Sequence, residues 1–135
     1  MYDIEHIGIA VKNLKNTGDL YAKLLGVSSY KQELVATENV LTEFYKTGNT
    51  KIELLEATSA DSVIARFIER KGEGMHHIAF KVDDIYAEIE RLSTLGFQFI
   101  DNTPKKGADN KLVCFVHPKS CNGVLIELCQ DVLKL

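Results

Sequence analysis

The sequence predicts an α+β fold of two tandem modules, each with the order strand, helix and three further strands (βαβββ). The first observation is an internal repeat: EHIGIAV near the start returns as HHIAFKV, and His6 and His77 lie 71 residues apart. At the same shift, Leu14 corresponds to Ile85. The second observation is that both copies continue from a strand-like run into apolar residues at helical spacing. Such a repeat indicates two related units that bury a shared face.

Length and composition indicate one domain with a sizeable core. The chain has 135 residues, of which 45% are hydrophobic, and only two Pro. We expect a single domain over residues 1–135, with module one at about 1–58, a connector helix at about 61–72 and module two at about 75–131.

Charge and hydropathy exclude several classes of function. The net charge is −3 and lysines and glutamates are interspersed, which argues against a nucleic-acid partner. No apolar segment approaches membrane-spanning length, so no membrane association is expected. Three cysteines, an odd number, favour reduced thiols. The expected location is the cytoplasm, or the mitochondrial matrix for a processed eukaryotic protein.

The first module begins with a strand at residues 4–11, followed by a helix. Asn13 is the predicted N-cap of the helix, and Gly26 ends it. Alternation along the strand separates a bulky face from a nearly bare one. The bare face carries His6, Gly8 and Ala10.

A hairpin signal at Gly48-Asn49 divides the last two strands of the first module. A two-residue loop there places Phe44 opposite Glu53. Glu43 then lies on the other face, where we interpret it as solvated or at a bulge.

The connector helix is predicted at residues 62–71, with Asp61 as its cap. The second module repeats the plan of the first, with His77 on the bare face of its first strand and a helix starting at Ile85. Its three remaining strands are expected at residues 97–102, 112–117 and 124–130.

Four polar side chains occupy equivalent places in the two modules. His6 and His77 open the first strand of each copy, and Glu53 and Glu127 lie in the last strand of each. All four share the face opposite the β-branched side chains, which the helices are expected to cover. Two imidazoles and two carboxylates converging there predict a site for a divalent metal. Burying both carboxylates without a cation would be costly.

Structural roles are the alternative for each of these residues alone. A lone histidine in a strand is more often a hydrogen-bonded structural residue than a metal ligand, and a lone glutamate in a strand is usually solvated. The symmetry of the four residues favours the metal site. His76 lies on the bulky face and is expected to donate to a carbonyl. His117 shares a face with Phe115 and is expected at the rim of the site.

Four segments carry a resemblance to a known family: EHIGIAV, GNTKIELLE, GEGMHHIAFKVDD and HPKSCNGVLIELCQ. With them the chain resembles the vicinal oxygen chelate superfamily and, within it, the methylmalonyl-CoA epimerases, over essentially its whole length. The resemblance implies a glyoxalase-like half-open barrel around a metal site. It makes His6, His77 and Glu127 metal ligands, with Glu53 at the remaining position. The implied cofactor is a divalent metal ion (Co, Mn, Ni, Zn or Mg), and the implied substrate an acyl-CoA.

Two positions depart from the family pattern. Some bacterial epimerases carry Gln where this chain has Glu53, and Glu there also fits a glyoxalase-like pattern. Thr42 stands where some members carry an acidic residue proposed as a catalytic base. The second proton-transfer residue therefore stays open, with Glu53 and Glu127 as the symmetric candidates.

Epimerisation of methylmalonyl-CoA through a metal-stabilised enolate is the leading functional prediction. The alternatives are a glyoxalase I-like lactoylglutathione lyase and a metal-free small-molecule binding (resistance) protein. A dioxygenase is disfavoured, because its two-His, one-carboxylate site leaves Glu53 unexplained. Exposed sheet edges favour a homodimer. The candidate anchors for the CoA phosphates are Lys105, Lys106, Lys111 and Lys119.

Overall fold

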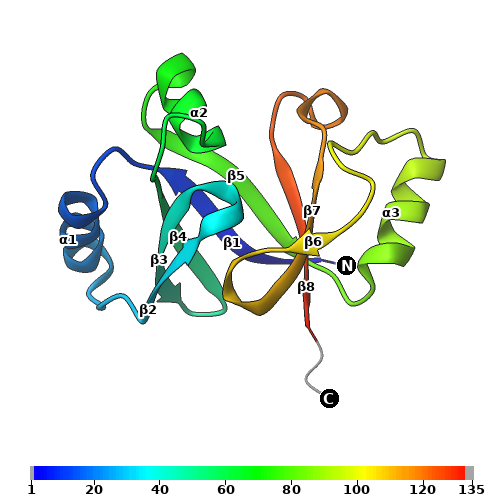
Figure 1. Cartoon of the computed structure of the whole chain (residues 1–135). Helices are drawn as coiled ribbons and strands as arrows, with labels where there is room; N and C mark the ends of the chain where they lie inside the picture. Colours follow the sequence, from blue (N-terminus) through cyan, green and yellow to red (C-terminus); the bar gives the residue numbers. More distant parts are fainter. Residues whose placement is uncertain (1, 133–135) are drawn as a thin grey trace. The chain divides into compact units, whose positions relative to one another are not determined.

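The computed structural model describes residues 2–132 and contains the elements drawn in Figure 1. The helices are α1 (Leu14–Leu25), α2 (Val63–Lys71) and α3 (Ile85–Thr94). The strands are β1 (Asp3–Ala10), β2 (Lys31–Val35), β3 (Val40–Thr47), β4 (Thr50–Ala57), β5 (Gly74–Lys81), β6 (Lys105–Lys106), β7 (Lys111–Val116) and β8 (Ile126–Asp131). The predicted α+β class and the repeated order of strand, helix and strands are confirmed. Within residues 2–132, no helix is long and apolar enough to span a membrane.

The chain forms two compact units. The first unit is His6–His76, and the second combines the residues up to Glu5 with those from His77 onward. That both make a single domain stays a prediction.

In the first unit the strands are ordered β2-β3-β4-β1, with β1 parallel to β4 and the other pairs antiparallel. Helix α1 begins at Asn13, whose side chain accepts from Asn16 N, and ends at Gly26 in the left-handed conformation, as predicted. It covers one face of these strands through a core of Val11, Leu14, Tyr45 and Leu54. His6 and Glu53 belong to the other face.

In the second unit the order is β5-β8-β7-β6, and β5 is parallel to β8. Helix α3 covers one face, because Ile85 and Leu92 pack against the strands. The strand residues of this core are Cys114, Val116 and Leu128, and Val82 joins them from the position just after β5. His77, Phe115 and Glu127 belong to the opposite face.

Strand register repeats between the two units. Gly8 of β1 pairs with Glu53, and Phe44 pairs with Glu53 from the other side. The Phe44 pairing confirms the register predicted from the hairpin. In the second unit Ala79 and Phe115 flank Glu127 in the same way. Each glutamate therefore lies between a small residue and a phenylalanine.

Helix α2 closes part of the open face of the first unit. Ile64 of α2 packs with Ala10, Val40 and Leu55. The cap of this helix is Ser62, whose hydroxyl accepts from Ile64 N, so the predicted cap at Asp61 is wrong by one residue.

The predicted strand at residues 97–102 is also wrong. This segment makes one isolated bridge, from Phe99 to Val116, and a regular strand of two residues forms later, at β6. Residues 101–104, Asp-Asn-Thr-Pro, explain the interruption, because they favour turns and proline has no N–H to donate to a sheet.

Candidate active site

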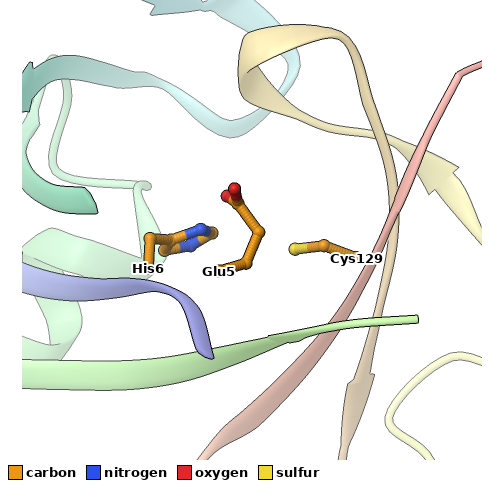
Figure 2. A group of neighbouring side chains, drawn as sticks. All are labelled: Glu5, His6 and Cys129. Atoms are coloured by element: carbon orange, nitrogen blue, oxygen red, sulfur yellow. The ribbon is translucent and has the colours of Figure 1, made fainter. Parts of the chain in front are cut away.

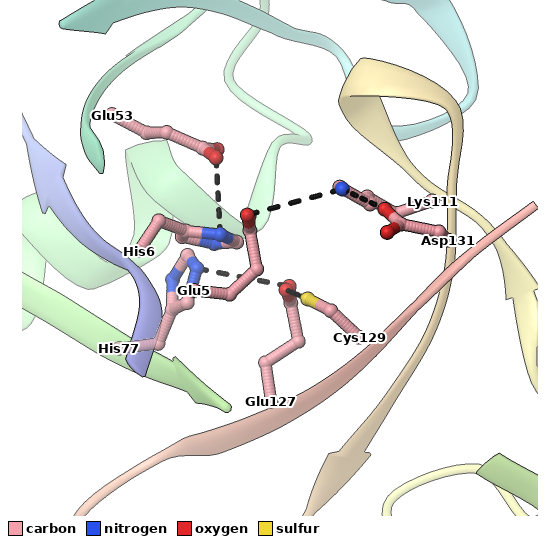
Figure 3. A network of polar contacts seen from close by, with 8 residues as sticks. All are labelled: Glu5, His6, Glu53, His77, Lys111, Glu127, Cys129 and Asp131. Atoms are coloured by element: carbon pink, nitrogen blue, oxygen red, sulfur yellow. Dashed lines mark hydrogen bonds and ion pairs between the residues drawn. The ribbon is translucent and has the colours of Figure 1, made fainter. Parts of the chain in front are cut away.

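The first unit brings His6 and Glu53 together. His6 Nδ1 lies 3.0 Å from Glu53 Oε2, and the two residues are 4% and 5% exposed. They come from neighbouring parallel strands, and Gly8 adds no side chain between them. Figure 3 shows the contact as a dashed line between the imidazole and the carboxylate. The first unit therefore supplies one buried imidazole beside one buried carboxylate.

The second unit repeats this pair with His77 and Glu127. His77 Nε2 lies 3.7 Å from Glu127 Oε1, and both residues are 6% exposed. The Phe115 ring packs edge-on against the His77 ring, with centroids 5.7 Å apart. Each unit therefore brings one of the predicted histidines next to one of the predicted glutamates.

Glu127 has a further partner that the sequence did not predict. Cys129 Sγ donates a hydrogen bond to Glu127 Oε2 over 2.6 Å. Cys129 lies two residues along β8 and therefore shares the face of Glu127. Glu5 carries a carboxylate within 4.8 Å of the Cys129 sulfur, and Figure 2 shows the Cys129 side chain directed toward it.

Lys111 connects Glu5 to the end of β8. Its Nζ lies 3.9 Å from Glu5 Oε2 and also forms an ion pair with Asp131 (Figure 3). The hydrogen bond from Lys111 lowers the pKa of Asp131 below its usual value. A glutamate on the same face of β1 as Ile7 and Ile9 was the signal that could have identified Glu5. Lys111, predicted as a CoA anchor, is instead held by carboxylates.

The two remaining histidines have structural roles. His76 packs edge-on against Phe67 of α2, and burial, with a smaller effect of Lys71, lowers its pKa to about 4. His117 accepts a hydrogen bond from Lys119 N through Nδ1 and caps a short 3-10 turn. A turn cap accounts for His117 without a part in the chemistry.

Glu43 differs from the prediction in one respect. It lies on the α1 side of the sheet, as its parity predicts, but it is 8% exposed and therefore not solvated. Gln32 and Tyr45 both donate hydrogen bonds to its carboxyl group. Burial and the contact with Glu43 raise the pKa of the Tyr45 hydroxyl. Hydrogen bonding under α1 compensates the burial of this carboxyl group.

The two His–Glu pairs have the chemistry of a metal site. Imidazole nitrogen and carboxylate oxygen are ligands of Zn and of the other divalent transition metals. Neighbouring ligands with bonds of about 2.1 Å lie roughly 3.0–3.4 Å apart. The separations of 3.0 Å and 3.7 Å are close to this range. Carboxylates at such positions are also suited to accept and return protons.

Comparison with known proteins identifies the family. Residues 5–115 match the model of the Glyoxalase/Bleomycin resistance protein/Dioxygenase superfamily. The chain is 40% identical over 130 residues to the uncharacterized protein YqjC of Bacillus subtilis (strain 168), covering 96% of this chain and 93% of that protein. It is 38% identical over 128 residues to the human mitochondrial methylmalonyl-CoA epimerase, covering 94% of this chain and 73% of that protein.

A solved structure supports the same family. The structure of a methylmalonyl-CoA epimerase in complex with methylmalonyl-CoA and NH4+ has a TM-score of 0.90 and 30% sequence identity, covering 98% of this chain and 96% of that chain. The chain therefore belongs to the glyoxalase/bleomycin resistance protein/dioxygenase superfamily and, within it, to the methylmalonyl-CoA epimerases, a family of isomerases.

Proposed function

We propose that this protein is a metal-dependent epimerase that interconverts (2R)- and (2S)-methylmalonyl-CoA. The observation that carries the proposal is the buried His–Glu pair that occurs once in each unit, at equivalent register positions. The family membership supports the same substrate class, an acyl-CoA.

The ligands in this proposal are His6, Glu53, His77 and Glu127, two from each unit. These residues would hold a divalent cation (Co, Mn, Ni, Zn or Mg), which would supply Lewis acidity to the substrate's thioester oxygen. The nitrogen and oxygen donor set and the separations within each pair fit such an ion.

Proton transfer is the part of the reaction assigned to the glutamates. The substrate carbon lies between a thioester and a carboxylate, and inversion needs a proton acceptor on one side and a donor on the other. In the proposal, Glu127 and Glu53 take these two roles, one from each unit. Phe44 and Phe115 flank them in the sheet, and apolar neighbours reduce the access of water.

The test supplies one epimer of methylmalonyl-CoA to the purified protein and follows the formation of the other. We expect turnover by the wild type and a decrease in kcat of about 10²–10⁴-fold for Glu127→Gln. Glu56→Gln is the matched control: Glu56 lies on β4, its carboxylate accepts from Leu14 N, and glutamine keeps that acceptor.

Two outcomes would overturn the proposal. Turnover of a glutathione hemithioacetal in place of methylmalonyl-CoA would assign the site to a lactoylglutathione lyase. Purified protein that binds no divalent metal and turns over neither substrate would indicate a metal-free binding protein.

A further inference from the structure

The two candidate glutamates are equivalent by repeat, but their neighbours differ. The residue two positions further along the strand is Leu55 after Glu53 and Cys129 after Glu127. Leu55 packs in the apolar cluster with Ala10, and its side chain has no group that can donate a hydrogen bond. Cys129 donates its thiol proton to Glu127 Oε2 over 2.6 Å. Only one of the two glutamates thus receives a donor from this position.

We propose that Cys129 is a positioning residue for Glu127. Its thiol engages Oε2, so that Oε1, the oxygen nearer to His77 at 3.7 Å, is the one presented to the cation and substrate. The inference rests on the proposed function, because it assigns a role to Glu127 in that reaction. The two glutamates would then differ: the Cys129 thiol holds Glu127 in one orientation, and no thiol stands at the equivalent position next to Glu53.

The surroundings of Cys129 make its thiol a fixed donor. Cys129 is fully buried and packs between Ala79 of β5 and Val113 of β7. Its backbone carbonyl accepts from Val82 N over 2.8 Å, and Val113 is its partner in the β7–β8 register. A side chain enclosed in this way has little freedom to turn its S–H group elsewhere.

Loss of this donor should affect turnover more than substrate binding. Residues that orient a ligand typically change metal affinity or activity by about 10–100-fold when replaced. We therefore expect Cys129→Ala to lower kcat by about 10-fold or more with little change in KM, and Cys129→Ser, which keeps a donor, to recover most of the loss.

Cys114→Ala is the matched control. Cys114 is also buried, but it belongs to the core beneath α3, on the opposite face of the same strands. Its replacement removes the same group from a core and should lower thermal stability while leaving kcat unchanged. A decrease in kcat as large as that of Cys129→Ala would mean that packing alone is responsible, and would overturn the inference.

A second measurement does not depend on turnover or on bound metal. Infrared spectra of the metal-free protein report the S–H stretch, and the Cys129 band is identified by its loss in Cys129→Ala. A thiol that donates to a carboxylate absorbs at lower wavenumber than a free thiol, so Glu127→Leu should move the band upward. An unmoved band would overturn the inference even if the wild type is active.

The two proposals can fail separately. An inactive wild type would overturn the proposed function, and the infrared band would then decide by itself whether the thiol holds Glu127. An active wild type with full kcat in Cys129→Ala would leave the epimerase assignment intact and refute the role of Cys129.

Discussion

Glu43 and Glu53 are buried carboxylic acids of one hairpin, yet they face opposite sides of the sheet. Glu53 pairs with His6 on the open face, whereas Glu43 is hydrogen-bonded by Gln32 and Tyr45 beneath α1. The difference follows from strand alternation: Glu43 pairs with Leu54, the neighbour of Glu53, and neighbouring residues of a strand point to opposite faces. A buried carboxyl group is therefore assigned a function only after its face is known.

His76 should make the stability of the metal-free protein depend on pH. Its folded pKa of about 4 is below the ordinary value of 6.5, so the unfolded chain binds a proton more readily between these values. Stability is therefore fully present above pH 6.5 and decreases as the pH falls toward 4, by at most about 3 kcal/mol. Urea unfolding of the chelated protein at several pH values measures this change.

His76→Gln removes the titrating group and should flatten the profile between pH 6.5 and 4. An equally steep decrease in the variant would show that other groups cause it, and the burial of a neutral His76 against Phe67 would then not matter for stability.

At the scale of elements, Gly18 allows α1 to lie close to β3. A Cβ at this position would lie 2.7 Å from Glu43 Oε1 and 3.0 Å from the Tyr45 hydroxyl oxygen. The Tyr45 hydroxyl oxygen also lies 2.9 Å from the Gly18 carbonyl oxygen, and Gln32 and Tyr45 hold the Glu43 carboxyl group, so these neighbours have little room to move. A glycine is therefore needed at this position because a side chain would clash with Glu43 and Tyr45, and not because of an unusual backbone conformation.

Gly18→Ala should destabilise the protein, although the same change usually stabilises a helix by about 1 kcal/mol. We expect a loss of about 1–3 kcal/mol in the free energy of unfolding by urea, because the helix must move away from the sheet. Asn16→Ala, at an exposed position of α1, serves as the control and should change stability by only a few tenths of a kcal/mol. A Gly18→Ala protein as stable as the wild type would contradict this packing.

The helices and most strands were predictable because each carries a local signal. Asn13 and Gly26 mark the ends of α1, and the Gly48-Asn49 turn determines the register of β3 and β4. Residues 97–102 have apolar residues but no continuous ladder, since a turn sequence follows them at once. Whether such a segment forms a strand depends on its pairing with a neighbouring strand, and the local sequence pattern does not reveal that pairing.

The candidate site was also predictable only where the sequence carries a pattern. The repeat predicted that His6, Glu53, His77 and Glu127 occupy equivalent positions on one face, and the structure shows each histidine next to the glutamate of its own unit. The contact of Cys129 with Glu127 breaks that symmetry, and the ion pair between Lys111 and Glu5 joins residues 106 positions apart. Contacts of this kind depend on tertiary packing, so no repeat or spacing predicted them.

At the scale of the whole molecule, duplication explains why two similar carboxylates are available. Each unit supplies one imidazole and one carboxylate, and the proposal takes one proton-transfer glutamate from each unit. The proposed epimerase therefore needs both copies, and the homodimer expected from exposed sheet edges stays a prediction.

Hydrogen exchange at the α-carbon of methylmalonyl-CoA tests the central claim most directly. The substrate is incubated in deuterated water with metal-loaded protein and, in parallel, with chelated protein. The account predicts deuterium uptake with loss of configuration in the metal-loaded sample only, because proton abstraction requires the stabilised enolate. No uptake by protein shown to hold metal would contradict both the epimerase assignment and the proton-transfer roles of Glu53 and Glu127.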